Sequence, residues 1–418
     1  MNKILISSEY LTQTGFATVC ENIADMLKHN NEVAIVDYSR KHNHFFRTNG
    51  VVFMGNPNPE EDRWAINKIL ELIDSFDTLF IINDIWNIDE ILESIKKSRK
   101  KLPKIVIYFP VDAKGHMGHW YKHMDIVSSI VTYTQFAKDV AAEAMRSDFA
   151  DRKIADEIID RISIIPHGIN RQHYYKIEDK NSIRREAFGT DKYDDAFIVL
   201  NANRNQPRKK LDITIRAFAH YLKTAKVDSY LYMHCAILDC YIDVYNYAKR
   251  VGIQDNLILS CPLENPHYRP SLSNEQMNLL YNACDVGINT SLGEGWGLCS
   301  VEQASLGVPQ IVPNHSACAE IFTKSEANFI ECPTELVMNN IMTVGKLADV
   351  NSASYQIYLM SDYIYRSKKA AISFEKFNAD CYSWEEDIAD AWITIFDNLK
   401  DTTIHEQLVS NHQKSTIL

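Results

Sequence analysis

Short runs of β-branched, aliphatic and aromatic residues alternate along the chain with stretches in which apolar residues recur every three or four positions. The short runs are typical of buried strands, and the longer stretches of helices that lay one apolar face on a sheet. In the first half the runs predict strands at 3–7, 32–38, 78–83, 104–112, 129–134 and 163–167. In the second half they predict strands at 196–202, 230–237, 256–262, 285–289, 309–312 and 328–332. This alternation predicts an α/β protein with two doubly wound parallel sheets.

Helical spacing between these runs supports the same architecture. The apolar positions of two predicted helices are Phe16, Val19, Ile23 and Leu27 in the first half and Leu211, Ile215, Phe218 and Leu222 in the second. After Cys332 the pattern turns helical, and the last apolar face is formed by Trp384, Ile388, Trp392, Ile395 and Phe396. A face with two tryptophans has to be buried, so we expect this helix to pack back on the first domain.

The polar and charged segment 170–195 lies between the two halves. It predicts an N-terminal Rossmann-like domain of residues 1–185 and a C-terminal Rossmann-like domain of residues 186–372. A C-terminal helix, 373–400, and a polar tail, 401–418, complete the predicted organisation. Because ligands of such sheets bind outside the carboxyl ends of the strands, we expect the site in a cleft where the two domains face each other.

The composition narrows the class of protein. Of 418 residues, 44 are basic and 55 acidic, and a net charge of −11 argues against a general nucleic-acid binder. Nine cysteines without a C-x-x-C pair indicate reduced thiols and a cytoplasmic protein. We expect no secretion signal and no transmembrane segment, because no run of apolar residues is long enough.

Glycine is scarce, with 14 residues in the chain, yet five glycines fall between positions 287 and 307. Here a predicted strand ends near Ser291, a glycine loop follows, and a short helix begins near Leu298 and stops at Gly307. Glycines allow a ligand to approach the backbone closely, and free N–H groups at a helix start favour an anion. The segment therefore predicts a binding loop for an anionic group.

Two carboxylates, Glu294 in the loop and Glu302 in the helix, are eight positions apart. This spacing suits the recognition of hydroxyl groups at two points of an extended ligand, such as a hexose and a ribose. An isolated pair with this spacing is more often a loop charge and a solvated helix residue, but the glycine setting favours binding.

A basic segment follows the first strand of the second half. Its cations are Arg204, Arg208, Lys209 and Lys210. Cations between a strand and a helix start can neutralise a diphosphate leaving group; the alternative is a solvated basic loop. We expect Arg208 and Lys210 to be surface charges.

The sequence Glu294-Gly-Trp-Gly-Leu, followed by Val-Glu302-Gln-Ala, resembles the retaining GT-B glycosyltransferases of the large family that includes sucrose synthases and lipopolysaccharide glucosyltransferases. The stretch 281–307 also resembles enzymes of large DNA viruses. The resemblance implies that Glu294 contacts the donor sugar, that Glu302 contacts the nucleotide ribose, and that Arg204 and Lys209 neutralise the diphosphate. The remaining donor-binding residues that we predict are Gly295, Trp296, Gly297 and Leu298. The glycine that usually follows the lysine in this family is replaced by Lys210.

The first half offers weaker candidates. Gly15 stands where the family has a glycine loop that closes over the sugar phosphate, although it could equally form a plain turn. Asp112 follows a predicted buried strand, and we expect it to contact the donor or the acceptor. His116 is expected in an exposed loop, and His167 in a structural turn.

The sequence thus predicts a GT-B glycosyltransferase that moves a sugar from a nucleoside-diphosphate sugar to a hydroxyl group of a glycan, lipid or other acceptor. The chain has no H-E-x-x-H pattern, phosphate-binding P-loop or G-x-S-x-G motif, so we expect neither a metal nor a cofactor beyond the donor substrate. Two alternatives share the fold: a nucleotide-sugar epimerase and a catalytically silent sugar-nucleotide-binding subunit.

Overall fold

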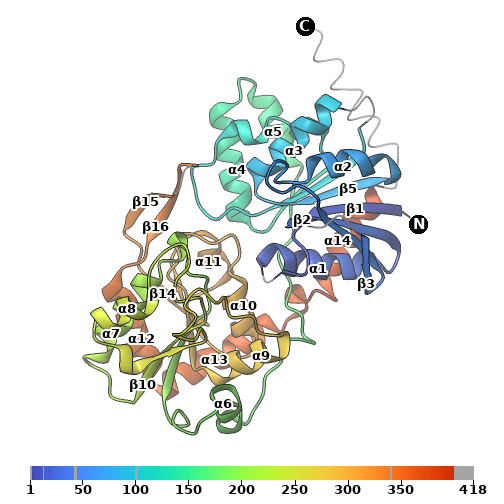
Figure 1. Cartoon of the computed structure of the whole chain (residues 1–418). Coiled ribbons are helices and arrows are strands. Elements are labelled where there is room, and N and C mark those ends of the chain that lie inside the picture. Colours follow the sequence, from blue (N-terminus) through green and yellow to red (C-terminus); the bar gives the residue numbers. More distant parts are fainter. Residues whose placement is uncertain (1, 13, 42–44, 99–101, 339–340, 400–418) are drawn as a thin grey trace. The chain divides into compact units, whose positions relative to one another are not determined.

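The computed structural model describes residues 2–12, 14–41, 45–98, 102–338 and 341–399. These residues form two compact units between which the chain passes more than once (Figure 1). Unit 1 contains Met1–Val111, Gly115–Gly168 and Ser383–Leu418, and unit 2 contains Asp112–Lys114 and Ile169–Tyr382. Each unit is an α/β domain with its own sheet, which is parallel in unit 2 and parallel except for one edge pair in unit 1, as the predicted α/β architecture requires.

Unit 1 is built on an eight-stranded sheet with the order β3-β4-β2-β1-β5-β6-β7-β8. Its strands are β1 Asn2–Ser8, β2 Asn31–Lys41, β3 Phe45–Thr48, β4 Val51–Asn56, β5 Thr78–Ile82, β6 Lys104–Phe109, β7 Ser129–Thr132 and β8 Ile162–Ile164. All neighbours pair in parallel except β3 and β4. The six strands predicted for this half are all present.

The antiparallel pair β3–β4 at the edge of this sheet was not predicted. Its turn is Asn49-Gly50, and both residues have a positive φ, 48° and 81°. Two consecutive positive φ values define the type I′ turn of tight hairpins, for which Asn-Gly is the preferred sequence. The dipeptide was therefore a local signal that could have found this hairpin.

The helices of unit 1 are α1 Gly15–Leu27, α2 Ile66–Leu72, α3 Ile85–Ser98, α4 Gln135–Asp148, α5 Arg152–Asp160 and α14 Asp387–Asn398. Figure 1 shows α14, in red, beside α1, in blue, although the two are far apart in sequence. The Trp392 side chain of α14 is fully buried, with its ring centroid 5.2 Å from that of Phe80 and 4.8 Å from that of Tyr108. The C-terminal helix thus packs back on the first domain, as predicted.

Unit 2 is built on a six-stranded parallel sheet with the order β11-β10-β9-β12-β13-β14. Its strands are β9 Phe197–Asn201, β10 Ser229–Met233, β11 Leu257–Leu259, β12 Val286–Ile288, β13 Gln310–Pro313 and β14 Ala327–Ile330. Its helices are α6 Lys180–Phe188, α7 Leu211–Leu222, α8 Val244–Arg250, α9 Asn274–Ala283, α10 Leu298–Ser305, α11 Ser316–Ile321, α12 Val350–Ser361 and α13 Tyr363–Phe377. All six predicted strands are again present.

The prediction that the chain turns helical directly after Cys332 is wrong. An antiparallel hairpin of β15, Thr334–Met338, and β16, Thr343–Leu347, precedes α12. Its position depends on contacts distant in sequence: the Val344 N–H donates to the Lys114 carbonyl at 2.8 Å, and the Lys346 N–H to the Leu292 carbonyl at 2.9 Å. The hydrophobic pattern of residues 334–347 does not predict these partners, because they are distant in sequence.

The unit boundaries also differ from the predicted ones. The chain passes from unit 1 to unit 2 at Gly168 and Ile169, before the predicted boundary of 185 and 186, and back at Tyr382 and Ser383, after that of 372 and 373. The segment before α6 belongs to unit 2 because the Tyr175 and Ile177 N–H groups donate to the side chains of Asn278 and Asn282 on α9, at 3.1 and 2.9 Å. The predicted tail 401–418 lies outside the described residues.

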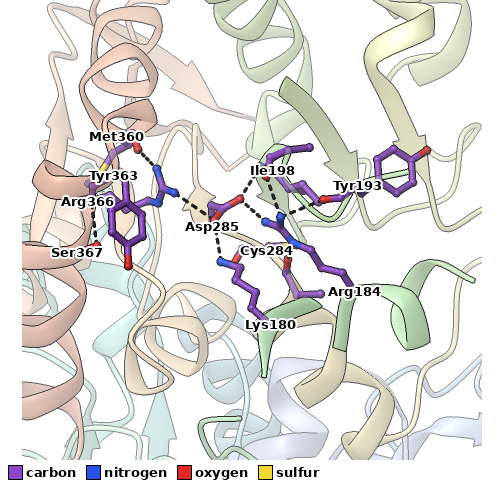
Figure 2. Close-up of polar contacts among 12 residues, drawn as sticks. Lys180, Arg184, Tyr193, Ile198, Cys284, Asp285, Met360, Tyr363, Arg366 and Ser367 are labelled. Atoms are coloured by element: carbon purple, nitrogen blue, oxygen red, sulfur yellow. Dashed lines mark hydrogen bonds and ion pairs between the residues drawn. The ribbon is translucent and has the colours of Figure 1, made fainter. Parts of the chain in front are cut away.

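A buried carboxylate ties α6 and α13 to the central strands of unit 2 (Figure 2). Asp285, directly before β12, pairs with Lys180 at 2.7 Å, Arg184 at 2.5 Å and Arg366 at 3.3 Å. It also accepts the Ile198 N–H at 2.8 Å. Burial by itself raises the pKa of Asp285, but Lys180 and Arg184 outweigh it and hold the pKa below its usual value. The carboxylate is therefore charged and joins three segments distant in sequence.

Asp285→Asn should destabilise unit 2 by about 3–5 kcal/mol, because it removes the charge that compensates three cations, two of which are largely buried. The measurement is unfolding in urea, in which hydrogen exchange of peptides from unit 2 reports the unfolding of that unit. The control is Arg185→Gln, which breaks an ion pair with Asp194 whose arginine is 60% exposed and should change the free energy of unfolding little, because solvent screens the pair. Equal urea midpoints for the two variants would contradict the structural role given to Asp285.

Candidate active site

The glycine loop joins β12 to α10 in unit 2, as predicted. Gly297 adopts φ +90°, which favours glycine, and α10 begins at Leu298 without a side-chain cap. Gly293 is required for a different reason, since a Cβ there would lie 2.2 Å from the Asp112 carbonyl oxygen. Gly307, with φ +75°, follows the end of α10, as predicted from its role as a helix terminator.

The remaining loop residues named from the sequence lie in the same segment. Gly295 is buried, and Trp296 is 5% exposed. The Glu294 N–H donates to the Ser316 hydroxyl at 3.1 Å, which ties the loop to the start of α11. The loop is therefore held by contacts within unit 2, and α10 presents its N-terminus at the carboxyl end of β12.

The Glu294 side chain is buried and surrounded by donors. Its Oε1 accepts hydrogen bonds from the Lys209 ammonium at 2.5 Å, the Ser291 hydroxyl at 2.6 Å and the Asn289 amide at 3.0 Å. Its Oε2 accepts one from Arg208 at 3.1 Å. Burial raises the pKa of this carboxyl, but Lys209 and Arg208 together hold it far below its usual range. Glu294 is thus a permanently charged anchor for two cations.

Glu302, on α10, has the opposite environment. It is 9% exposed, and its Oε2 accepts the Tyr281 hydroxyl at 3.0 Å. Burial raises the pKa of Glu302 to about 7, although hydrogen bonds from Tyr281 and Tyr174 act against this rise. The two acids of the motif therefore differ in charge near neutral pH: one is ionised, and the other is close to half-protonated.

Two of the four basic residues of segment 204–210, Arg208 and Lys209, share Glu294 as a partner, and the other two have partners of their own. Lys209 binds Glu294, whereas Arg204 lies 3.6 Å from Asp239 with 45% of its side chain exposed. Lys210 donates to the Tyr241 hydroxyl at 3.2 Å. Arg208 pairs with Glu294 and with Asp112, so the expectation that it is a surface charge is wrong. The basic segment thus combines an exposed cation, Arg204, with three cations held by partly buried contacts.

Lys210 occupies a left-handed backbone conformation, with φ 50° and ψ 49°. A residue with a side chain adopts this conformation at a cost of about 1 kcal/mol, whereas glycine does so freely. This explains physically why a glycine suits the position.

Asp112, expected to contact substrate, is the counter-ion of Arg208, with Oδ2 and Nε 3.3 Å apart. It belongs to unit 2, together with Ala113 and Lys114. The structure therefore brings Asp112, Glu294 and Lys209 into one network through Arg208, a residue that sequence reasoning set aside.

The other candidates from the first half lie in unit 1. Gly15 is the first residue of α1, after the N-cap Thr14, at the carboxyl end of β1. His116 is buried rather than exposed, 2.8 Å from the Tyr121 hydroxyl, and burial lowers its pKa to about 3. His167 is buried 3.0 Å from the Tyr108 hydroxyl, with its pKa also lowered to about 3 by burial. Both histidines are thus neutral parts of the core of unit 1.

Sequence reasoning missed Asn289, Ser291 and Ser316 as site residues. The first two belong to the polar run Asn289-Thr290-Ser291 at the end of a buried strand, a signal that points to a site in parallel sheets. Ser316 gave no such signal, because its contact with the glycine loop depends on the placement of α11.

Within the described ranges, no group of three or more His, Cys, Asp or Glu side chains is arranged to hold a metal ion. None of the described helices is both long and apolar enough to cross a membrane.

Residues 182–339 match the family model described as Glycosyl transferases group 1. This range contains the basic segment, the glycine loop, Glu294 and Glu302. No curated protein matches the sequence.

Solved structures of the same architecture cover nearly the whole chain. Sucrose-phosphate synthase from Thermosynechococcus elongatus aligns with a TM-score of 0.72 at 12% identity, covering 96% of this chain and 100% of its own. HepE from Anabaena, solved with UDP and glucose, aligns with a TM-score of 0.66 at 13% identity, and the alignment covers 95% of this chain and 100% of HepE. WaaG, a glycosyltransferase involved in lipopolysaccharide biosynthesis, aligns with a TM-score of 0.63 at 14% identity, and the alignment covers 93% of this chain and 99% of WaaG. The fold is GT-B, and with the family match it supports a glycosyltransferase.

The raised pKa of Glu302 predicts a pH-dependent stability. Because the folded pKa, about 7, lies above the unfolded value of about 4.5, the folded state loses stability as pH rises between these values. Glu302→Gln removes this loss. The free energy of unfolding of the variant should therefore be higher than that of the unmodified chain by up to about 3 kcal/mol at pH 8, and the two should be equal near pH 4.5. Urea midpoints at both pH values measure this, with Glu186→Gln on the exposed face of α6 as control. A constant difference between the variant and the unmodified chain at both pH values would contradict it.

Proposed function

We propose that the protein is a retaining, metal-independent glycosyltransferase that moves a sugar from a nucleoside diphosphate to an acceptor hydroxyl group. Its acceptor is a glycan, a lipid or another hydroxyl compound, and it works in the cytoplasm. The donor binds to unit 2 through the glycine loop, the N-terminus of α10 and the basic segment 204–210.

The observation that carries this proposal is the partly buried ion pair between Lys209 and Glu294, whose charged atoms are 2.5 Å apart. It brings the basic segment and the glycine loop together, although they are 85 positions apart in the chain. The cations of the basic segment and the N–H groups at the start of α10 can then bind one anionic ligand. A diphosphate fits this arrangement.

The chemistry follows from charge. As the bond between the anomeric carbon and the β-phosphate oxygen breaks, the sugar becomes oxocarbenium-like and the diphosphate gains negative charge. Arg204, Lys209 and the start of α10 stabilise that charge. The acceptor oxygen forms the new bond from the face of the departing phosphate, which takes the acceptor proton, so the anomeric configuration is kept. Glu302 accepts hydrogen bonds from the ribose hydroxyl groups.

A panel of nucleotide sugars, each incubated with and without candidate acceptors, should show release of nucleoside diphosphate that depends on an acceptor. UDP-glucose is the first donor to test, because the fold relative HepE was solved with it. NMR of the product should show the anomeric configuration of the donor, and a chelator should leave the rate unchanged. An epimerised donor without transfer would indicate an epimerase, and binding without turnover would indicate a silent subunit; either result would overturn the proposal.

Substitutions separate transfer from binding. Arg204→Ala should lower kcat by about 100-fold, because it removes one donor of charge stabilisation from the transition state. Glu302→Ala should weaken nucleotide binding by about 10-fold, because hydrogen bonds to the ribose are lost. Steady-state kinetics and calorimetric titration with UDP measure the two effects. Unchanged kcat in the first variant and unchanged affinity in the second would contradict the assigned roles.

A further inference from the structure

Four charged side chains of alternating sign form a continuous row in unit 2. Asp112 contacts Arg208 at 3.3 Å, Arg208 contacts Glu294 at 3.1 Å, and Glu294 contacts Lys209 at 2.5 Å. The exposed fraction falls from 36% for the Asp112 side chain to 28% for Arg208 and 5% for Glu294, and it is 13% for Lys209. Arg208 therefore connects a partly exposed acid to a buried one.

The buried end of this row is crowded with donors. Lys209, Ser291 and Asn289 donate to Oε1 of Glu294, whereas Arg208 donates to Oε2. Arg208 also donates to the Gly293 carbonyl, so its guanidinium spans the loop backbone and the carboxylate. Its planar group, with several donors in fixed directions, suits this double contact in a way that a lysine ammonium does not.

The exposed end of the row is fixed independently of Arg208. The Lys114 carbonyl accepts the Val344 N–H at 2.8 Å, which joins this segment to β16. Ala113, 3% exposed, packs with Leu292 and Met338. Backbone pairing and packing thus hold Asp112 in place, and its carboxylate can orient the arginine.

We propose that Arg208 is a positioning residue for the donor site and that Asp112 acts through Arg208 rather than on the substrate. This inference rests on the proposed function. Arg208 shares the negative charge of Glu294, so Lys209 does not have to neutralise it alone and keeps ammonium protons for the diphosphate. Without Arg208, Lys209 is the sole cation beside a buried carboxylate and is drawn toward it.

The test is a double-mutant cycle on kcat with Arg208→Gln, Asp112→Asn and the double variant in the full chain. UDP-glucose, or the donor that the panel identifies, is used with its acceptor. Arg250→Gln is the matched control, because this exposed arginine on α8 lies outside the row. Arg208→Lys is the conservative variant that keeps the charge and loses the planar group.

Arg208→Gln should lower kcat by about 30-fold and Asp112→Asn by about 5-fold, within the coupling range of residues in contact. The double variant should be no slower than Arg208→Gln, because Asp112 has no other route to the reaction. Arg208→Lys should recover part of kcat, and Arg250→Gln should match the unmodified chain. The urea midpoints of the same four proteins distinguish this role from a structural one. If the role were only structural, the effects of the two substitutions would depend on each other in stability but not in kcat.

Effects of Arg208→Gln and Asp112→Asn that multiply in the double variant would overturn the inference, because they would place Asp112 in direct contact with the substrate. An Arg208→Gln variant with unchanged kcat would overturn it as well. Absence of transfer by the unmodified chain with every donor and acceptor would instead overturn the proposed function, and the inference with it.

Discussion

The burial of the Glu294 carboxylate is the constraint on which the site depends. A charge with 4% exposure needs compensating cations and hydrogen bonds, and the chain supplies them from three segments. Lys209 and Arg208 come from the basic segment, Asn289 and Ser291 from the end of β12, and the Ser316 hydroxyl fixes the Glu294 backbone. Satisfying one carboxylate therefore assembles the basic segment and the glycine loop into a single surface.

Three of the buried acids of unit 2, Asp285, Glu294 and Glu302, are compensated in three different ways. Asp285, before β12, has three cations and joins α6 and α13 to the sheet. Glu294, after β12, pairs with two cations, whereas Glu302 accepts hydrogen bonds from tyrosine hydroxyl groups. The first arrangement serves the scaffold. The other two leave one acid ionised and the other near its titration point, which suits groups with separate tasks on one ligand.

Part of the network around Glu294 comes from a segment that follows a strand of unit 1. Residues 112–114 leave unit 1 after β6, join unit 2 through Arg208, β16 and the glycine loop, and return to unit 1 at Gly115. The C-terminal part of the chain makes a comparable return, since α13 belongs to unit 2 and α14 to unit 1. Sequence periodicity contains no information on such crossings, because each segment keeps the same local pattern whichever sheet it joins.

The sequence by itself determined the twelve predicted strands and the strand-loop-helix unit around Glu294, and its Asn49-Gly50 dipeptide specifies the hairpin β3–β4. Each depends on local alternation or on a backbone conformation that few residues adopt. Tertiary structure alone decided that Arg208 is a network member, that His116 is buried, that residues 334–347 form a hairpin, and that Glu294 and Glu302 differ in pKa. These properties arise from partners far away in the chain, and burial and charge pairing act through space rather than along the sequence.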